Sequence, residues 1–183
     1  YDMATQITRS RQYAARLQRG LRDIPTLSVT GEKDDFFGSN GIYVDTQNRN
    51  IEASVSAEYF HPGLTTDGVN VEEGFQIDCG GKLQGGASRN PGSSIKHSLS
   101  LRFRDLYGSG KLNYPVFEGT EVTTFDSIHL RAMYNNSWHH SNSGQRARAT
   151  MIRDQWARDC MIDMGNADGG QGHFVHLYIN GLY

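Results

Sequence analysis

Hydrophobic and polar residues alternate in several segments of the chain with a period of two, which is the period of a half-buried β-strand. The clearest such segment is residues 95–104. One of its faces is apolar apart from a histidine, and the other carries hydroxyls and cations. The residues of the polar face are Lys96, Ser98, Ser100, Arg102 and Arg104.

Residues 51–60 alternate in the same way, which predicts a second strand. Shorter apolar segments predict further strands, and glycine and proline residues between them predict turns. The segments are residues 27–30, 74–79, 125–134 and 173–179.

A helical period appears in two places. Residues 4–22 have apolar positions near one face and arginines largely elsewhere, and Pro25 follows them. In residues 146–164, Ile152, Trp156 and Cys160 recur at every fourth position, which predicts a long helix with a buried stripe.

These elements predict an α+β fold, with a mostly antiparallel sheet of about five strands and flanking helices. We expect residues 1–50 to form an N-terminal helix and lead-in extension, and residues 51–183 to form the main domain. Asn180-Gly181 predicts a tight hairpin turn, because both central residues of a type I′ turn need positive φ. Only two residues follow that turn, so we expect an unpaired strand edge and self-association through it.

Composition limits the functional classes. The 183 residues carry a formal net charge of −2, which argues against a dedicated nucleic-acid-binding protein and makes any phosphate site local. The sequence has no apolar segment of membrane-spanning length and no signal-peptide pattern at its start, so no membrane association is expected. We expect Cys79 and Cys160 to be free buried thiols rather than a disulfide, and no metal at His139–His140.

A glycine-rich segment precedes the cationic strand face, and together they suit an anion such as phosphate. Its backbone can approach an anion closely, while Lys96, Arg102 and Arg131 supply positive charge and donors. The other interpretation is structural, with the glycines shaping a hairpin and the cations solvating a sheet face. Sequence spacing leaves both open, since the Walker pattern is absent.

The chain resembles the CotH family of spore-coat-type atypical protein kinases. The resemblance rests on GGASRNPGSSIKHSLSLRFRDLYGSGKLNYPVF, FDSIHLRAMYNNSW, RATMIRDQWARDCMIDMG and GHFVHLYINGLY, in that order and spacing, and covers about residues 74–183. It implies the N-terminal portion of an atypical protein-kinase-like fold that binds ATP. The acidic catalytic residues and the Mg²⁺ ligands of that family lie beyond the matching segments, so no catalytic residue is assigned here.

The resemblance also implies roles for individual residues. The loop of Gly85, Gly86 and Ser88 covers the nucleotide, and Tyr134 or Trp138 forms a wall for adenine. Of Lys96 and Arg102, one contacts phosphate and the other pairs with a carboxylate, with Lys96 assigned to the phosphate. The expected activity is phosphorylation of protein serine or threonine, which this chain does not perform alone.

Two other functions stay open on the sequence. The first is a non-catalytic scaffold or binding domain of a bacterial coat or extracellular protein, with other coat or extracellular proteins as partners. The second is a carbohydrate-binding surface, suggested by Trp138 and the polar loops. The family resemblance implies a coat-associated or extracellular setting in a bacterium.

Overall fold

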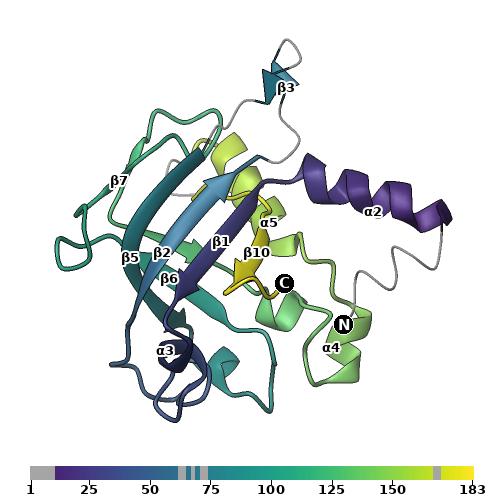
Figure 1. Cartoon of the computed structure of the whole chain (residues 1–183). Coiled ribbons are helices and arrows are strands. Elements are labelled where there is room, and N and C mark those ends of the chain that lie inside the picture. Colours follow the sequence, from purple (N-terminus) through teal and green to yellow (C-terminus); the bar gives the residue numbers. More distant parts are fainter. Residues whose placement is uncertain (1–10, 62–64, 67–68, 71–73, 167–169) are drawn as a thin grey trace. The chain divides into compact units, whose positions relative to one another are not determined.

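The computed structural model describes residues 11–61, 65–66, 69–70, 74–166 and 170–183 (Figure 1). The fold is α+β, as predicted. Its helices are α2 (Arg11–Asp23), α3 (Lys33–Phe37), α4 (Ser143–Ala147) and α5 (Arg153–Asp163), with short 3₁₀ turns η1 (Ala87–Arg89) and η2 (Tyr134–Asn136). Its strands are β1 (Thr26–Gly31), β2 (Ala53–Phe60), β3 (Thr65–Thr66), β4 (Val69–Asn70), β5 (Gly74–Gln84), β6 (Ser98–Arg102), β7 (Leu112–Asn113), β8 (Thr124–Phe125), β9 (Ser127–Leu130) and β10 (His176–Ile179).

Six strands form one sheet in the order β10-β1-β2-β5-β6-β9, and β3-β4 and β7-β8 form two-stranded ribbons. β5, β6 and β9 pair antiparallel, whereas β1 and β10 pair parallel. The predicted mostly antiparallel sheet is therefore confirmed. The chain divides into two compact units, described separately below.

The first unit comprises Tyr1–Thr30, Ala57–Gln76 and Phe174–Tyr183. Helix α2 ends just before Pro25, and β1 follows with Leu27 and Val29 buried. The predicted hairpin turn is confirmed: Asn180 and Gly181 have φ of 47° and 77°.

The second unit comprises Gly31–Ser56 and Ile77–His173. Its apolar core is built from alternate residues of the antiparallel strands, together with α3 and the loop after it. The fully or almost fully buried members are Phe36, Ile42, Ala53, Val55, Leu83, Leu99, Leu101 and Phe103. The predicted burial of the odd-numbered positions is correct within residues 53–59 and 97–103, whereas Ile51 is half-buried and Ile95 is exposed.

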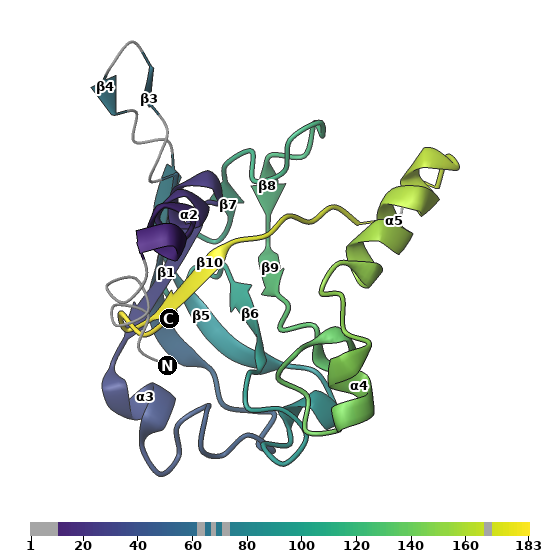
Figure 2. The same ribbon diagram turned by 90° about the vertical axis from the view of Figure 1, so that its right-hand side faces the viewer.

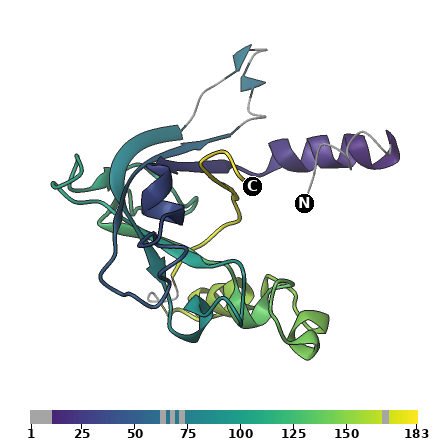
Figure 3. The ribbon, with the colours of Figure 1, turned by 60° about the horizontal axis from the view of Figure 1, so that its bottom comes forward.

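The cationic strand is shorter than predicted. β6 begins at Ser98, so Ile95 and Lys96 lie in a bend before it and both are exposed. The bend forms because the Ser94 hydroxyl donates to the Lys96 carbonyl oxygen at 3.0 Å, while Ser94 bridges His140. This loop and the segment before α4 lie side by side (Figure 3), so tertiary pairing overrides the alternating pattern.

Two further boundaries differ from the prediction. The strand predicted at residues 125–134 ends at Leu130, because the backbone N–H of Ala132 donates to the Ser98 hydroxyl and Met133 turns the chain with φ of 58°. Tyr134 therefore lies in η2 rather than on a strand.

The long helix predicted at residues 146–164 is broken into α4 and α5. The break is made by Asn136, whose side-chain oxygen accepts hydrogen bonds from the N–H and the hydroxyl of Thr150, and by Met151, with φ of 62°. The expected buried stripe is also wrong. Ile152 and Trp156 are exposed, and α5 stands away from the strands of its own unit (Figure 2).

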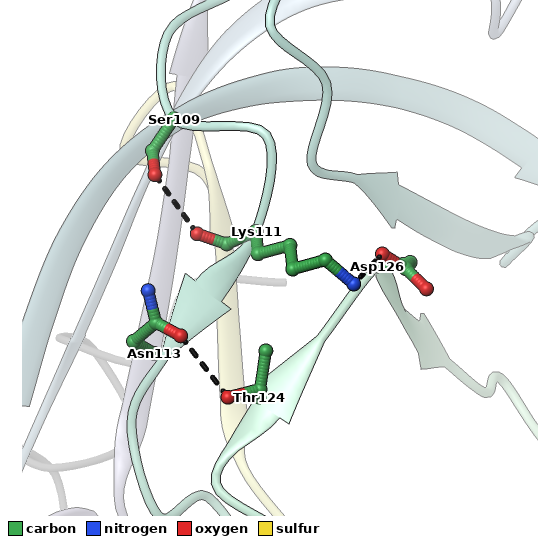
Figure 4. A network of polar contacts seen from close by, with 5 residues as sticks. All are labelled: Ser109, Lys111, Asn113, Thr124 and Asp126. Atoms are coloured by element: carbon green, nitrogen blue, oxygen red, sulfur yellow. Dashed lines mark hydrogen bonds and ion pairs between the residues drawn. The ribbon is translucent and has the colours of Figure 1, made fainter.

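A polar network holds the β7-β8 ribbon (Figure 4). The hydroxyl of Thr124 donates to the side-chain oxygen of Asn113 at 3.0 Å, and Lys111 pairs with Asp126 at 2.9 Å. Because these side chains are exposed, the network fixes the ribbon's geometry and contributes little to stability.

Both cysteines are free, as predicted, but only Cys79 is fully buried, while Cys160 is half-buried. Burial, with smaller contributions from Asp78 and Glu52, raises the pKa of Cys79 from 9.0 to about 12. We therefore expect a thiol reagent at pH 8 to modify Cys160 first and Cys79 only after unfolding, because the thiolate is the reactive form. The unfolded chain loses this proton earlier, so stability should fall as pH rises from 9.0 towards about 12.

Mass spectrometry of the labelled chain would check this order. Equal rates of modification at the two cysteines in the folded protein would contradict it.

Candidate functional site

The second unit gathers charged side chains around Glu52, just before β2. The Glu52 side chain is only 11% exposed and forms ion pairs with Arg104 at 3.2 Å and Arg102 at 3.5 Å. Burial raises the pKa of Tyr107, and the negative charge of Glu52 adds to this effect. We call Glu52, Lys82, Arg102, Arg104 and Tyr107 the Glu52 cluster.

Gly80 makes room for this carboxylate. A Cβ atom at Gly80 would overlap Oε1 of Glu52 and lie 2.7 Å from a ring carbon of Tyr107. A glycine in the middle of β5 is otherwise unfavourable, and close approach by another group is a common reason for one. Gly80 therefore leaves space for the Glu52 and Tyr107 side chains, and it does not form a turn.

Strand register places Lys82 on the same face as Arg102. In the antiparallel pairing of β5 and β6, Gly80 lies opposite Arg102 and Lys82 lies opposite Ser100. Ser100 in turn lies opposite His129 of β9. Residues directly opposite one another share a face, so this side of the sheet carries Lys82, Ser100, Arg102 and His129.

Lys82 differs from the other two cations of the cluster. Arg102 and Arg104 share the Glu52 carboxylate, whereas Lys82 has no ion pair among the described residues. Partial burial, followed by the charge of Arg102, lowers the pKa of Lys82. A bound anion would offset this repulsion between neighbouring cations.

A buried hydroxyl lies beside Lys82. Ser100 is completely buried, and its hydroxyl has no hydrogen-bond partner in the part of the chain that the structure describes. Unpaired buried polar atoms are uncommon because they lose their bonds to water. The Glu52 cluster therefore has more cations than carboxylates, and beside it lies a hydroxyl that is closed off from solvent.

The glycine-rich loop is held by a buried arginine. Arg89 is 4% exposed, and its guanidinium donates to the carbonyl oxygens of Thr46 at 2.6 Å, Leu83 at 2.8 Å and Asn48 at 2.8 Å. These three bonds join the loop to β5 and to the segment before β2. Sequence analysis did not single out Arg89, because its acceptors are backbone atoms up to 43 residues away.

The loop residues named by the sequence analysis lie next to this anchor. Gly85 has φ of 118°, and a Cβ atom there would overlap the Ser88 hydroxyl. A Cβ atom added at Gly86 would have no atom within 4 Å outside its own neighbours in the chain. The Ser88 carbonyl oxygen accepts a hydrogen bond from His97 at 2.9 Å. The loop is thus shaped by both glycine and side-chain contacts.

The remaining predicted site residues do not form ion pairs with the Glu52 cluster. Lys96 is exposed in the bend before β6, and Arg131 pairs with Asp154 at 3.0 Å. The ring of Tyr134 packs on His140, with centroids 4.9 Å apart. The structure therefore groups Arg102 with Lys82 and Arg104 rather than with Lys96, and it supplies Glu52 as the carboxylate expected beside Arg102.

Trp138, the other aromatic residue considered for adenine, is exposed on the loop before α4. Its indole N–H donates to the carbonyl oxygen of Ala149 at 3.0 Å. This bond holds the ring against the connection between α4 and α5, leaving much of its surface open to solvent.

A hollow of about 410 Å³ adjoins the Glu52 cluster. Glu52 belongs to both, and the hollow is otherwise lined by residues of α3, the following loop and the start of β2: Asp34, Asp35, Gly38, Ser39, Asn40, Ile51 and Ala53. Within the described ranges, no group of three or more histidine, cysteine or acidic residues is arranged to hold a metal. The lining of the hollow thus carries three carboxylates, those of Asp34, Asp35 and Glu52, and none of the cations of the Glu52 cluster.

No protein-family model, curated protein or solved structure matches this chain. Among the described residues, no helix has the length and apolar character needed to cross a bilayer.

Proposed function

We propose that this chain forms the nucleotide-binding side of a CotH-like, ATP-dependent protein kinase acting on serine or threonine. The carrying observation is the Glu52 cluster, where three cations lie around one carboxylate on one side of the sheet. Within the Glu52 cluster one carboxylate lies among three cations, which supports the binding of a multiply charged anion such as a nucleotide phosphate.

Within this proposal the residues of the Glu52 cluster have different roles. Glu52 orients the Arg102 and Arg104 guanidinium groups, whose planar forks match phosphate oxygens. Lys82 supplies a charge that is not engaged in an ion pair with any described residue, and it lies opposite Ser100 in the pairing of β5 and β6. Lys96 and the loop of Gly85, Gly86 and Ser88 would close over the same ligand.

The proposed adenine contact and the proposed metal rest on the resemblance to the CotH family alone. Tyr134 remains the proposed adenine neighbour, together with Arg131 as a further anion ligand. When bound, Mg²⁺ would neutralise charge on the phosphates, and its ligands are expected outside this chain. The chain's own residues would bind and orient the nucleotide, and we expect no phosphoryl transfer by this chain alone.

The scaffold function has one structural feature in its favour. The apolar side chains of α5 are exposed, with Trp156 at 66% and Ile152 at 54%. Exposed tryptophan is typical of protein-binding surfaces. A coat or extracellular protein partner is therefore the second candidate, and it requires no nucleotide.

Thermal unfolding of the 183-residue chain with and without Mg·ATP tests the proposal. At one hundred times its Kd, a ligand that binds only the folded state adds about 2.7 kcal/mol to stability. Inorganic triphosphate should stabilise the chain as well, and adenosine much less, because the proposed contacts are made to phosphate. Stabilisation by none of these ligands would reject the nucleotide site and favour the scaffold function.

A further inference from the structure

The connection between α4 and α5 contains no residue that requires a break in the helix. It comprises residues 148–152 and has neither glycine nor proline. Arg148, Ala149 and Met151 are good helix formers. Ile152 already has a right-handed helical backbone, with φ of −110° and ψ of −13°. The local sequence therefore allows one continuous helix, as its period predicted.

Two residues from outside the connection take the backbone groups that a continuous helix would use. Asn136 accepts from the N–H of Thr150 at 2.9 Å through its side chain, and from the N–H of Met151 at 3.2 Å through its carbonyl oxygen. The indole N–H of Trp138 donates to the carbonyl oxygen of Ala149 at 3.0 Å. We call Asn136 and Trp138 the clamp. In a helix the same three groups would bond to backbone groups four residues away, so each has a partner in either arrangement.

The clamped arrangement has three unfavourable features. Met151 has φ of 62°, in the left-handed region that residues other than glycine rarely adopt. Nδ2 of Asn136 is buried and has no hydrogen-bond partner in the described part of the chain. Helix α5 begins without a side-chain cap, and the N–H groups of residues 152–155 donate to no described residue. A continuous helix would remove the first and the third of these features.

Helix α5 is held only weakly in its present orientation. None of its own residues is buried, and it stands away from the strands of its unit (Figure 2). Its ion pair from Asp154 to Arg131 joins two partly exposed side chains, so it contributes little to stability. Little packing therefore opposes a reorientation of α5.

We propose that residues 143–163 are a two-state element. In the clamped state, which this structure shows, α4 and α5 are separate. In the released state, a minor one in the wild-type chain, Asn136 and Trp138 give up their hydrogen bonds and one helix runs from Ser143 to Asp163. Release frees the Trp138 indole and turns Trp156 together with α5. A partner that contacts either ring only in one state would shift the equilibrium towards that state.

Hydrogen exchange of individual amides, measured by NMR on the full chain, tests this proposal. In the released state the N–H groups of residues 152–155 bond to the carbonyl oxygens of residues 148–151. Asn136→Ala removes the acceptor for Thr150, so these four amides should exchange at least about tenfold more slowly than in the wild type. Adding Met151→Gly should restore fast exchange, because glycine adopts positive φ freely and weakens a helix.

The double variant Thr150→Ala with Trp138→Phe is an independent route to release. Both side chains are exposed, so the core stays intact if Asn136→Ala fails to fold. It removes two hydrogen bonds of the clamped state and should slow exchange at residues 152–155 at least about threefold. Unchanged exchange at these residues in the variants that fold would overturn the proposal. Faster exchange there, together with faster exchange in β2, would overturn it as well, because that pattern reports general destabilisation.

Discussion

Replacing Arg89 by methionine is expected to lower the free energy of unfolding by about 3–5 kcal/mol, the cost of breaking a buried charged network. The Arg89 guanidinium is buried and donates three hydrogen bonds to backbone carbonyl oxygens. Methionine fills much of the same volume but cannot donate, so the carbonyl groups of Thr46, Leu83 and Asn48 lose their charged partner inside the protein. Arg89→Lys should recover only part of the loss, because an ammonium group lacks the planar fork of donors.

Urea unfolding of the wild type and the variants would measure this effect. Arg131→Met is the matched control, since Arg131 is exposed and its ion pair with Asp154 is worth about 0–1 kcal/mol at most. Equal stabilities of the Arg89 and Arg131 variants would show that the loop does not depend on its buried guanidinium.

The sequence predicted the strands better than their ends. The alternation in residues 51–60 and 98–103 reflects a real division between core and polar face, so β2 and most of β6 were found. Local pattern could not show that Ser94 pairs with His140 and stops β6 at Ser98. Nor could the local pattern show that Asn136 accepts a hydrogen bond from the Thr150 N–H and thereby interrupts the predicted helix.

The candidate site was predicted only in part, for a similar reason. Arg102 was found because it lies on the polar face of a regular strand. Glu52, Lys82 and Arg89 were not, because their roles come from contacts between segments about 20 to 50 residues apart, which spacing along the chain does not encode. A glycine at position 80 within a strand pattern was the one available signal of close approach.

Replacing Lys82 by methionine should weaken ATP binding more than tenfold while changing stability little. Lys82 has no ion pair among the described residues, so its removal leaves no carboxylate without a partner. A charge-assisted contact to phosphate is worth about 1.5–3 kcal/mol, and 1.4 kcal/mol already corresponds to a factor of ten in Kd. Arg102→Met should also weaken binding. It should lower stability as well, because the largely buried Glu52 carboxylate then retains only its ion pair with Arg104.

Lys96→Met separates the structural assignment from the sequence-based one. Lys96 lies on the exposed bend before β6, whereas Lys82 lies on the sheet beside Arg102. If the loop closes over the ligand, Lys96→Met will weaken binding, but less than Lys82→Met does. Intact affinity in Lys96→Met, together with unfolding of Arg102→Leu, would assign both of those residues to structure.

The central claim is that the Glu52 cluster holds the phosphates of a nucleotide, and the Kd of ATP for Lys82→Met tests it most directly. Isothermal titration would compare this variant with the wild type and with Lys111→Met, which removes an exposed lysine paired with Asp126 on the β7-β8 ribbon. We predict a Kd more than tenfold higher for Lys82→Met and unchanged for Lys111→Met. Wild-type affinity in the Lys82→Met variant, or an equal loss in both variants, would contradict the claim.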